Sequence, residues 1–179
     1  HEICSHGYRW IDYQYRDIEE ERDHLNKAIE IISRVTGERP LGWYTGRNSP
    51  NTRDLVMQEG GFLYDSDAYN DDVPYFVEVE GKQHLVVPYT SDVNDFRYWN
   101  SPGLSQASDF LEYMQESFDV LYEEATDGLR MMSIGLHPRM VGRPGRVRAI
   151  KRFIEYAQAH EGVWFTTREE IAKAWLARA

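Results

Sequence analysis

Apolar residues recur at helical spacing along much of the chain, and short apolar runs separate these segments. The segment from Arg16 to Thr36 gives the strongest signal, because its apolar residues return every three or four positions with charged residues between them. Gly37 follows it and supplies the left-handed residue that commonly ends a helix. The same periodicity predicts helices over 51–59, 108–126 and 146–160, and a capping box at 167–170 opens a last one.

Short apolar runs bounded by glycine, proline or charged residues predict the strands. These runs lie at residues 41–45, 62–64, 75–79, 85–89, 129–136 and 163–165. The chain also opens with a strand-like stretch that ends at His6. Residues 90–105 are polar and aromatic without a period, which is typical of a long loop.

The alternation of strands and helices predicts an α/β fold whose parallel sheet is covered on both faces, either as an open sheet or as a barrel. No repeat, linker or low-complexity tract interrupts residues 1–179, so we expect one domain. Ligands bind such folds at the carboxyl ends of the strands. The residues at those ends are His6, Thr45 to Ser49, Asp65 to Asp67 and His137.

The chain is acidic, with 20 Lys and Arg against 30 Asp and Glu and a net charge of −10. This charge argues against nucleic acid and anionic membrane as partners, because phosphate groups require concentrated positive charge. No apolar stretch is long enough to span a bilayer, and the first residues do not resemble a signal peptide. A single cysteine, Cys4, excludes an internal disulfide and fits a reducing compartment, so we expect a cytoplasmic protein.

The chain begins at His1, in what reads as the interior of a strand. We therefore expect that an N-terminal portion is missing from this sequence and that part of any active site lies on it. The missing strands could come from upstream residues or from a separate chain.

Two histidines stand where predicted strands end. His137 closes the apolar run 129–136, and Pro138 prevents that strand from continuing. An imidazole at such a place suits proton transfer near neutral pH. His6 could bind a metal together with a second histidine four residues later, but that position holds Trp10, so the metal site is incomplete. Either histidine, taken alone, could equally be a hydrogen-bonded part of the fold.

Asp65 and Asp67 follow the predicted strand 62–64. Paired carboxylates can act as acid and base or hold a cation. The same two side chains could instead cap backbone amides in a turn. The sequence leaves both roles open.

Arg47 lies just beyond the predicted strand 41–45, where its guanidinium could bind a carboxylate or a substrate carbonyl at two points. Arg39 is the competing arginine, but it precedes that strand and should lie at the opposite end of the fold. Trp43 is one of several aromatic residues that could line a pocket, although core packing is the ordinary role of each.

Four segments together resemble the polysaccharide deacetylase superfamily and, within it, the allantoinase branch, the urate-catabolism proteins. The segments run from His1 to Trp10, Gly42 to Arg47, Tyr64 to Asp67 and Gly135 to Arg146, and they occur in the family's order. The set is specific, and the resemblance spans nearly the whole chain.

The resemblance implies a distorted (β/α) barrel of which residues 1–179 are the C-terminal part, with strands and an aspartate-rich catalytic motif missing upstream. The family's zinc-dependent members use a pair of histidines as ligands. The first maps to His6 and the second to Trp10, which implies a protein that binds no metal and needs no other cofactor. The closing histidine motif maps to His137, and the arginine motif maps to Arg47, with Arg39 also similar to the pattern.

The resemblance further implies a hydrolase that opens a cyclic amide, specifically the hydantoin ring of allantoin, to give allantoate. Water attack on the carbonyl forms an oxyanion that pre-positioned donors stabilise, and the departing ring nitrogen takes a proton. His137 would be the acid, His6 would orient water or bind a ring oxygen, and Arg47 would fix the substrate or a catalytic carboxylate. The remaining substrate contacts would come from Asp65, Asp67, Trp43 and Trp10.

Two alternatives stay open. A metal-dependent deacetylase of N-acetylated polysaccharide or peptidoglycan would use the same scaffold and require zinc. A non-catalytic member of the fold would bind a ligand or partner through the aromatic loop 90–105. The partner expected for an enzyme is a small-molecule substrate, and the resemblance also implies a homo-oligomer.

Overall fold

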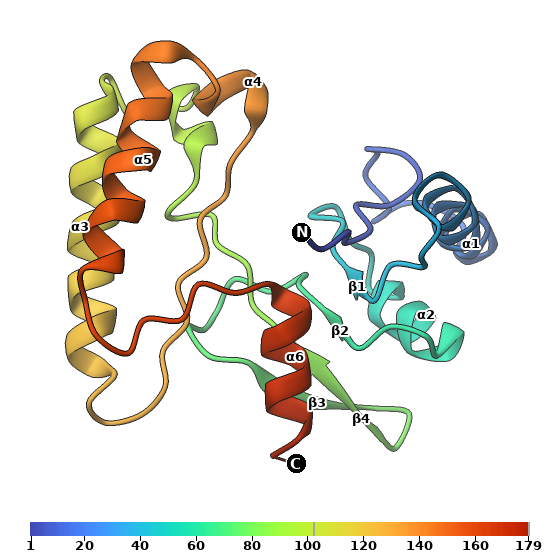
Figure 1. Cartoon of the computed structure of the whole chain (residues 1–179). Coiled ribbons are helices and arrows are strands. Elements are labelled where there is room, and N and C mark those ends of the chain that lie inside the picture. Colours follow the sequence, from blue (N-terminus) through green and yellow to red (C-terminus); the bar gives the residue numbers. More distant parts are fainter. Residues whose placement is uncertain (102, 179) are drawn as a thin grey trace. The chain divides into compact units, whose positions relative to one another are not determined.

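The computed structural model describes residues 1–101 and 103–178, which fall into two compact units (Figure 1). Unit 1 contains residues 1–88 and 166–178, and unit 2 lies between these two stretches of chain, from Tyr89 to Phe165. The expectation of a single domain over 1–179 stays a prediction.

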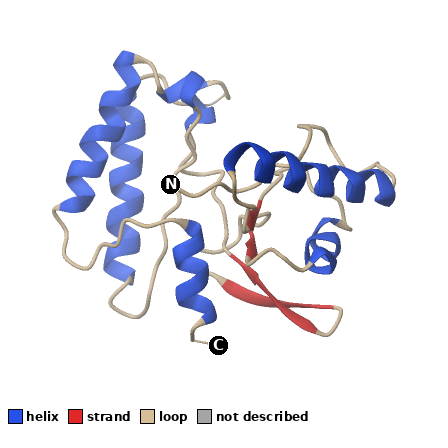
Figure 2. Cartoon of the chain, turned by 45° about the vertical axis from the view of Figure 1, so that its right-hand side comes forward, coloured by secondary structure: helices blue, strands red, loops and turns tan. Residues whose placement is uncertain are grey.

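Unit 1 is built on a four-stranded mixed sheet with the order β1-β2-β4-β3. Its strands are β1 (Gly42–Trp43), β2 (Tyr64–Asp65), β3 (Tyr75–Val79) and β4 (Lys82–Val86). β1, β2 and β4 run parallel, as the sequence predicted, and β3 pairs with β4 as an antiparallel hairpin (Figure 2). The hairpin register pairs Tyr75 with Val86 and Val79 with Lys82, so β4 begins and ends three residues earlier than predicted.

Three helices belong to unit 1: α1 (Ile18–Thr36), α2 (Thr52–Glu59) and α6 (Arg168–Leu176). α1 ends at Gly37 in the left-handed conformation, and Thr167 opens α6 with the predicted capping box. α1 and α2 bury Trp43 of β1, which packs with Leu25 and Leu55. Both helices therefore cover the face of the sheet from which Trp43 projects.

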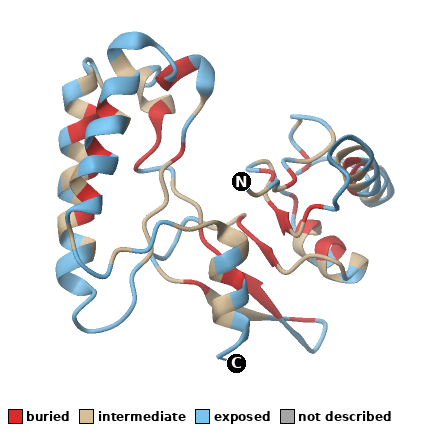
Figure 3. Cartoon of the chain, viewed as in Figure 1, coloured by how far each residue is buried: buried red, intermediate tan, exposed pale blue. Residues whose placement is uncertain are grey.

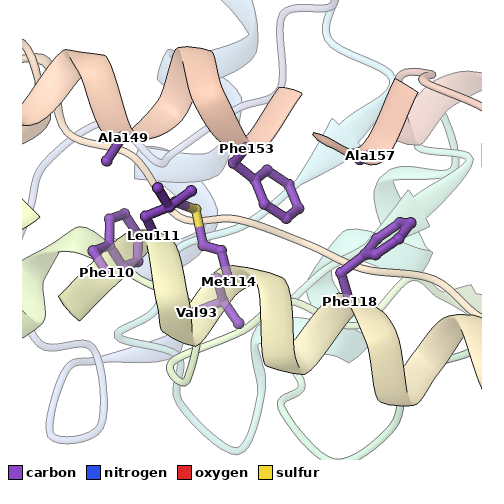
Figure 4. Packing of buried hydrophobic residues seen from close by; sticks show 8 residues of the cluster. All are labelled: Val93, Phe110, Leu111, Met114, Phe118, Ala149, Phe153 and Ala157. Atoms are coloured by element: carbon purple, nitrogen blue, oxygen red, sulfur yellow. The ribbon is translucent and has the colours of Figure 1, made fainter. Parts of the chain in front are cut away.

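Unit 2 contains the short 3₁₀ helix η1 (Asp95–Tyr98) and the α-helices α3 (Ala107–Glu124), α4 (Pro138–Val141) and α5 (Pro144–Gln158). α3 and α5 lie side by side, and their buried residues face each other (Figure 3). The core between them is formed by Val93, Phe110, Leu111, Met114, Phe118, Ala149, Phe153 and Ala157 (Figure 4).

The strands predicted at 129–136 and 163–165 are wrong. Within the described residues of unit 2, the first run makes one isolated bridge, between Gly135 and Asn94, and the second makes none. The apolar side chains Met132, Ile134 and Val163 instead pack against the α3–α5 core. Their hydrophobicity reflects packing on helices, which an apolar run alone does not distinguish from strand pairing.

Among the described residues, no helix is both long and apolar enough to cross a bilayer. The cytoplasmic location stays a prediction.

Met114 offers a test of the unit 2 core because it is fully buried between α3 and α5. Met114→Ala should lower the free energy of unfolding by about 2–5 kcal/mol, since it removes apolar contacts and leaves a cavity. Val120→Ala is a matched control on an exposed position of the same helix and should change that free energy by less than about 0.5 kcal/mol. Urea unfolding followed by circular dichroism measures both, and equal losses would contradict the described packing.

Candidate active-site residues

His137 is held by a buried carboxylate in unit 2. Its Nδ1 lies 2.6 Å from Oδ1 of Asp95, and its side chain is 32% exposed whereas that of Asp95 is fully buried. A carboxylate at this distance accepts a hydrogen bond from Nδ1–H, so Nε2 is the ring atom left to exchange a proton with a ligand. This arrangement suits a general acid or base.

The backbone around His137 fixes the carboxylate of Asp95 in turn. Oδ2 of Asp95 accepts hydrogen bonds from the backbone N–H groups of His137 at 2.8 Å and Val141 at 3.1 Å. The backbone of Asp95 also donates to the carbonyl of Gly135. A side chain at position 135 would collide with Asn94, so glycine permits this close approach between the two segments. Asp95 therefore orients His137 through several contacts.

The two faces of the unit 1 sheet carry different side chains. Because successive residues of a strand point to opposite faces and Trp43 is in register with Asp65, these two side chains share the face covered by α1 and α2. Their neighbours Tyr44 and Ser66 belong to the opposite face by the same alternation. Ser66 accepts a hydrogen bond there from Arg168.

Asp65 is the centre of a buried ion-pair network. Its oxygens accept hydrogen bonds from Nε and Nη2 of Arg53, from Nε2 of His84 at 2.8 Å, and from the backbone of Asp67. Burial by itself raises the pKa of Asp65, but the hydrogen bonds from His84 and Arg53 outweigh it and hold the pKa below its usual value. With its oxygens so occupied, Asp65 is placed to anchor α2 and β4 rather than to receive a ligand.

Asp67 joins the ends of β1 and β2. Its carboxylate accepts hydrogen bonds from the backbone N–H groups of Thr45 and Gly46, the latter at 2.7 Å. Burial raises the pKa of Asp67 to about 6 despite these hydrogen bonds, and the charge of Asp65 adds to the rise. Gly46 has a φ of +63°, a conformation that favours glycine and lets both N–H groups reach one carboxylate. Asp67 thus fixes the backbone that leads into Arg47.

A cavity of about 190 Å³ lies at this end of the covered face. It is lined by Trp43, Asn48, Ser49, Pro50, Thr52, Arg53, Val56, Asp65 and Asp67. The cavity brings together three of the predicted substrate contacts, Trp43, Asp65 and Asp67.

His6, Arg47 and Trp10 also belong to unit 1, where His6 makes one ring contact and Arg47 and Trp10 make another. The exposed ring of His6 contacts the ring of Tyr44 edge to face, with centroids 5.0 Å apart. The Arg47 guanidinium lies 4.3 Å from the ring centre of Trp10, which is 69% exposed. Arg39 forms an ion pair with Glu59 instead.

The sequence did not point to Asp95, Arg53 or His84. Asp95 lies in the aperiodic stretch that was predicted to be a loop, so no pattern predicted that its side chain would be buried. Arg53 lies inside a predicted helix, and His84 lies between two predicted strands. Neither residue follows the end of a predicted strand, which is where the sequence analysis looked for functional side chains. Only the pairing of β2 with β4 and the packing of α2 bring them to Asp65.

The donor set around His6 does not fit zinc. The position four residues later is the indole of Trp10, which offers no ligand atom and stacks against the cation of Arg47. Within the described residues, no three histidine, cysteine or acidic side chains converge as metal ligands. We therefore derive no catalytic step through a metal.

No protein-family model matches the chain. Among solved structures, the crystal structure of PuuE allantoinase is 59% identical to it and has a TM-score of 0.95, over 99% of this chain and 59% of the other. The crystal structure of a polysaccharide deacetylase, described as probable, from Pseudomonas aeruginosa PAO1 is 57% identical with a TM-score of 0.94, over 98% and 59% of the two chains.

A Schizosaccharomyces pombe protein named "Putative polysaccharide deacetylase" is 44% identical over 99% of this chain and 61% of its own length. The chain therefore spans about three fifths of the length of these relatives.

The raised pKa of Asp67 predicts a pH-dependent stability. The folded state favours the protonated carboxyl of Asp67, and this preference adds to the free energy of unfolding. The contribution is complete below the pKa of Asp67 in the unfolded chain, about 4, and is lost as the pH rises through its pKa in the folded protein, about 6. The free energy of unfolding of the wild type, minus that of Asp67→Asn, should therefore fall by about 1–3 kcal/mol from pH 4 to pH 7.

Urea unfolding at several pH values measures this difference. Asp71→Asn removes an exposed carboxylate that follows the same strand and is the control for the general effect of losing one negative charge. A difference for Asp67→Asn that stays constant from pH 4 to pH 7 would contradict the raised pKa.

Proposed function

We propose that this chain, which belongs to the polysaccharide deacetylase superfamily, forms part of a hydrolase that acts on carbon–nitrogen bonds other than peptide bonds. The predicted α/β fold of this family is confirmed by the TM-scores of 0.94 and 0.95. Since the chain spans about three fifths of its relatives' length, the proposed activity is that of the complete protein.

The hydrogen-bonded pair of His137 and Asp95 carries the proposal. Hydrolysis of an amide forms a bond from water oxygen to the carbonyl carbon, releases one proton from that water, and breaks the bond to nitrogen, which leaves only after it takes a proton in turn. The Asp95 carboxylate accepts a hydrogen bond from Nδ1–H and stabilises the imidazolium, so Nε2–H of that imidazolium can deliver its proton to the leaving nitrogen. His137 is the catalytic residue in this scheme, and Asp95 is its positioning residue.

The substrate we propose is a cyclic amide, with the hydantoin ring of allantoin opening to allantoate. The support is the 59% identity with PuuE allantoinase, together with Trp10 at the position where a second zinc ligand would be required. His6 would orient water or bind a ring oxygen, Arg47 would fix the substrate, and Trp10 would contact it. His6 and Trp10 are exposed and so are reachable by a ligand.

A metal-dependent deacetylase of N-acetylated polysaccharide or peptidoglycan is the second candidate. The names of the relatives from Schizosaccharomyces pombe and Pseudomonas aeruginosa favour it. The two candidates differ in their response to chelators, because acetate release by a zinc-dependent enzyme should be abolished by metal removal and ring opening by a metal-free enzyme should not.

A small-molecule substrate, assembly as a homo-oligomer and a cytoplasmic location complete the proposal. The net charge of −10 supports a partner other than nucleic acid or an anionic membrane.

The first test replaces the proposed acid. His137→Ala in the complete protein should reduce kcat for allantoin hydrolysis by about 10² to 10⁴, the range typical of a general acid or base. His160→Gln is the matched control, because it changes another histidine of unit 2 whose contacts are the rings and backbone of the helix pair. Unchanged turnover in His137→Ala would remove His137 from the mechanism.

The second test separates orientation from stability. Asp95→Asn keeps an oxygen acceptor but removes the charge that selects the Nδ1–H form, so kcat should fall by about 10² to 10⁴ and the pH profile of kcat should change. A role limited to folding would alter the yield or the thermal stability of the protein and leave the pH profile of the folded fraction as in the wild type. That result would end the assignment of Asp95 as a positioning residue.

A further inference from the structure

We propose that Arg146 is a positioning residue for the pair of His137 and Asp95, because it holds together the two short elements that carry this pair. Asp95 is the first residue of η1, and His137 directly precedes α4. The proposal rests on the proposed function, since it assigns Arg146 a role in the proton transfer by His137. It adds to that function the residue that keeps the proton donor aligned.

The Arg146 side chain bridges the two elements from the first turn of α5. Its guanidinium carbon lies 4.2 Å from the ring centre of Tyr98, which is the last residue of η1. Its Nη1 donates a hydrogen bond at 3.2 Å to the backbone carbonyl of Met140 in α4. One planar group therefore contacts η1 and α4 at the same time.

Both elements depend on contacts of this kind, because each is a single turn with few hydrogen bonds of its own. The carboxylate of Asp95 joins them at the start of η1, through His137 and the backbone of Val141. A single turn attached at one place can rotate about it. Arg146 attaches the opposite end of η1, and two separate attachments fix the orientation of η1 relative to α4.

Tyr98 offers Arg146 a fixed surface, because the core of unit 2 holds its ring. The ring packs edge to face on Phe110 of α3, with centroids 5.9 Å apart, and Phe110 is fully buried. Tyr98 itself packs against the cluster of buried residues between α3 and α5. The rigid core therefore supports the segment that carries His137 through Tyr98 and Arg146.

The two contacts explain why an arginine stands at this position. The first turn of α5 has no acidic residue, and a cation there faces the partial positive charge of the helix N-terminus, which is unfavourable for the helix itself. A guanidinium presents a flat face to an aromatic ring and N–H groups at its edge, so it can make both contacts from one place. A lysine ammonium is a point charge and cannot do so.

Arg139 is a second arginine that approaches η1, and it makes a weaker contact. Its guanidinium carbon lies 5.9 Å from the ring centre of Trp99, and both side chains are exposed. Water competes for an exposed cation, so such a contact contributes less than a closer and less exposed one. Arg146 is therefore the arginine that we expect to hold the pair in place.

The test measures kcat, KM and the Nδ1 proton resonance of His137 in the complete protein, with the resonance identified by its loss in His137→Ala. Arg146→Met removes both contacts, and Arg146→Lys keeps the charge without the planar geometry. We expect each variant to lower kcat for allantoin hydrolysis by about 10- to 100-fold with KM little changed, since misplacing a catalytic group by about 1 Å can cost about 10² in rate. The Nδ1 resonance should shift or broaden in both variants, because the hydrogen bond to Asp95 loses its alignment. Arg148→Met changes an exposed arginine of the same helix and should leave all three quantities unchanged.

Tyr98 provides a matched test from the other side of the contact. Tyr98→Leu removes the ring under Arg146 and should lower kcat like Arg146→Met, whereas Tyr98→Phe keeps the ring and should retain kcat. The double variant Tyr98→Leu/Arg146→Met should lose no more than the more affected single variant, because the same contact cannot be removed twice. Fully additive losses would show that the two residues act separately and would overturn the proposal.

Wild-type kcat and an unchanged Nδ1 resonance in folded Arg146→Met would overturn the proposal, as would full activity in Arg146→Lys. A role limited to folding would lower the thermal stability and leave kcat per folded molecule and the resonance as in the wild type. If Arg146→Met does not fold, Arg146→Lys and Tyr98→Leu decide the question. Unchanged turnover in His137→Ala would defeat the proposed function, and the resonance would still report whether Arg146 aligns His137 with Asp95.

Discussion

Burying an ionised carboxylate costs several kcal/mol unless hydrogen bonds and opposite charges compensate, and this constraint organises both units. Asp95 is fully buried and has three hydrogen-bond donors from the segment 137–141. Asp65 is 2% exposed and has Arg53 and His84 as partners. Because each partner has to stay in place, the two aspartates fix the backbone and side chains around them. The candidate acid His137 and the floor of the unit 1 cavity both owe their geometry to this requirement.

The elements with local signals were predictable from the sequence. The helical spacing of its apolar residues predicted α1, and Gly37 predicted where α1 ends. The capping box of Thr167 and Glu170 predicted where α6 begins. These signals lie within a few residues of the structure that they specify, and tertiary contacts reinforce them. The apolar run 129–136 had no such local signal. It became a packing segment because the α3–α5 pair offered it an apolar surface, and that pairing is not encoded within the run itself.

In the candidate site, too, residues with a local sequence signal were predicted, and residues placed by tertiary contacts were missed. His137, Asp65 and Asp67 were found because they follow apolar runs, and strand ends are where ligands bind in α/β folds. The partner Asp95 was missed, since it lies 42 residues away from His137 in a stretch without a period. The sequence also grouped Asp65 with Asp67 as equivalent carboxylates. The structure separates them, because Arg53 and His84 lower the pKa of Asp65 whereas burial raises that of Asp67.

Arg168, near the end of the chain, donates hydrogen bonds through Nη1 to Ser66 and to the carbonyls of Val87 and Pro88. Unit 1 is thus discontinuous in sequence, and residues 66 and 87 receive this guanidinium only from the stretch that follows unit 2 in the chain. During vectorial synthesis the whole of unit 2 leaves the ribosome before unit 1 can close, since domains assemble as their residues emerge. A ribosome that terminates ahead of residue 166 would release a chain whose inserted unit is complete and whose sheet lacks its final anchor.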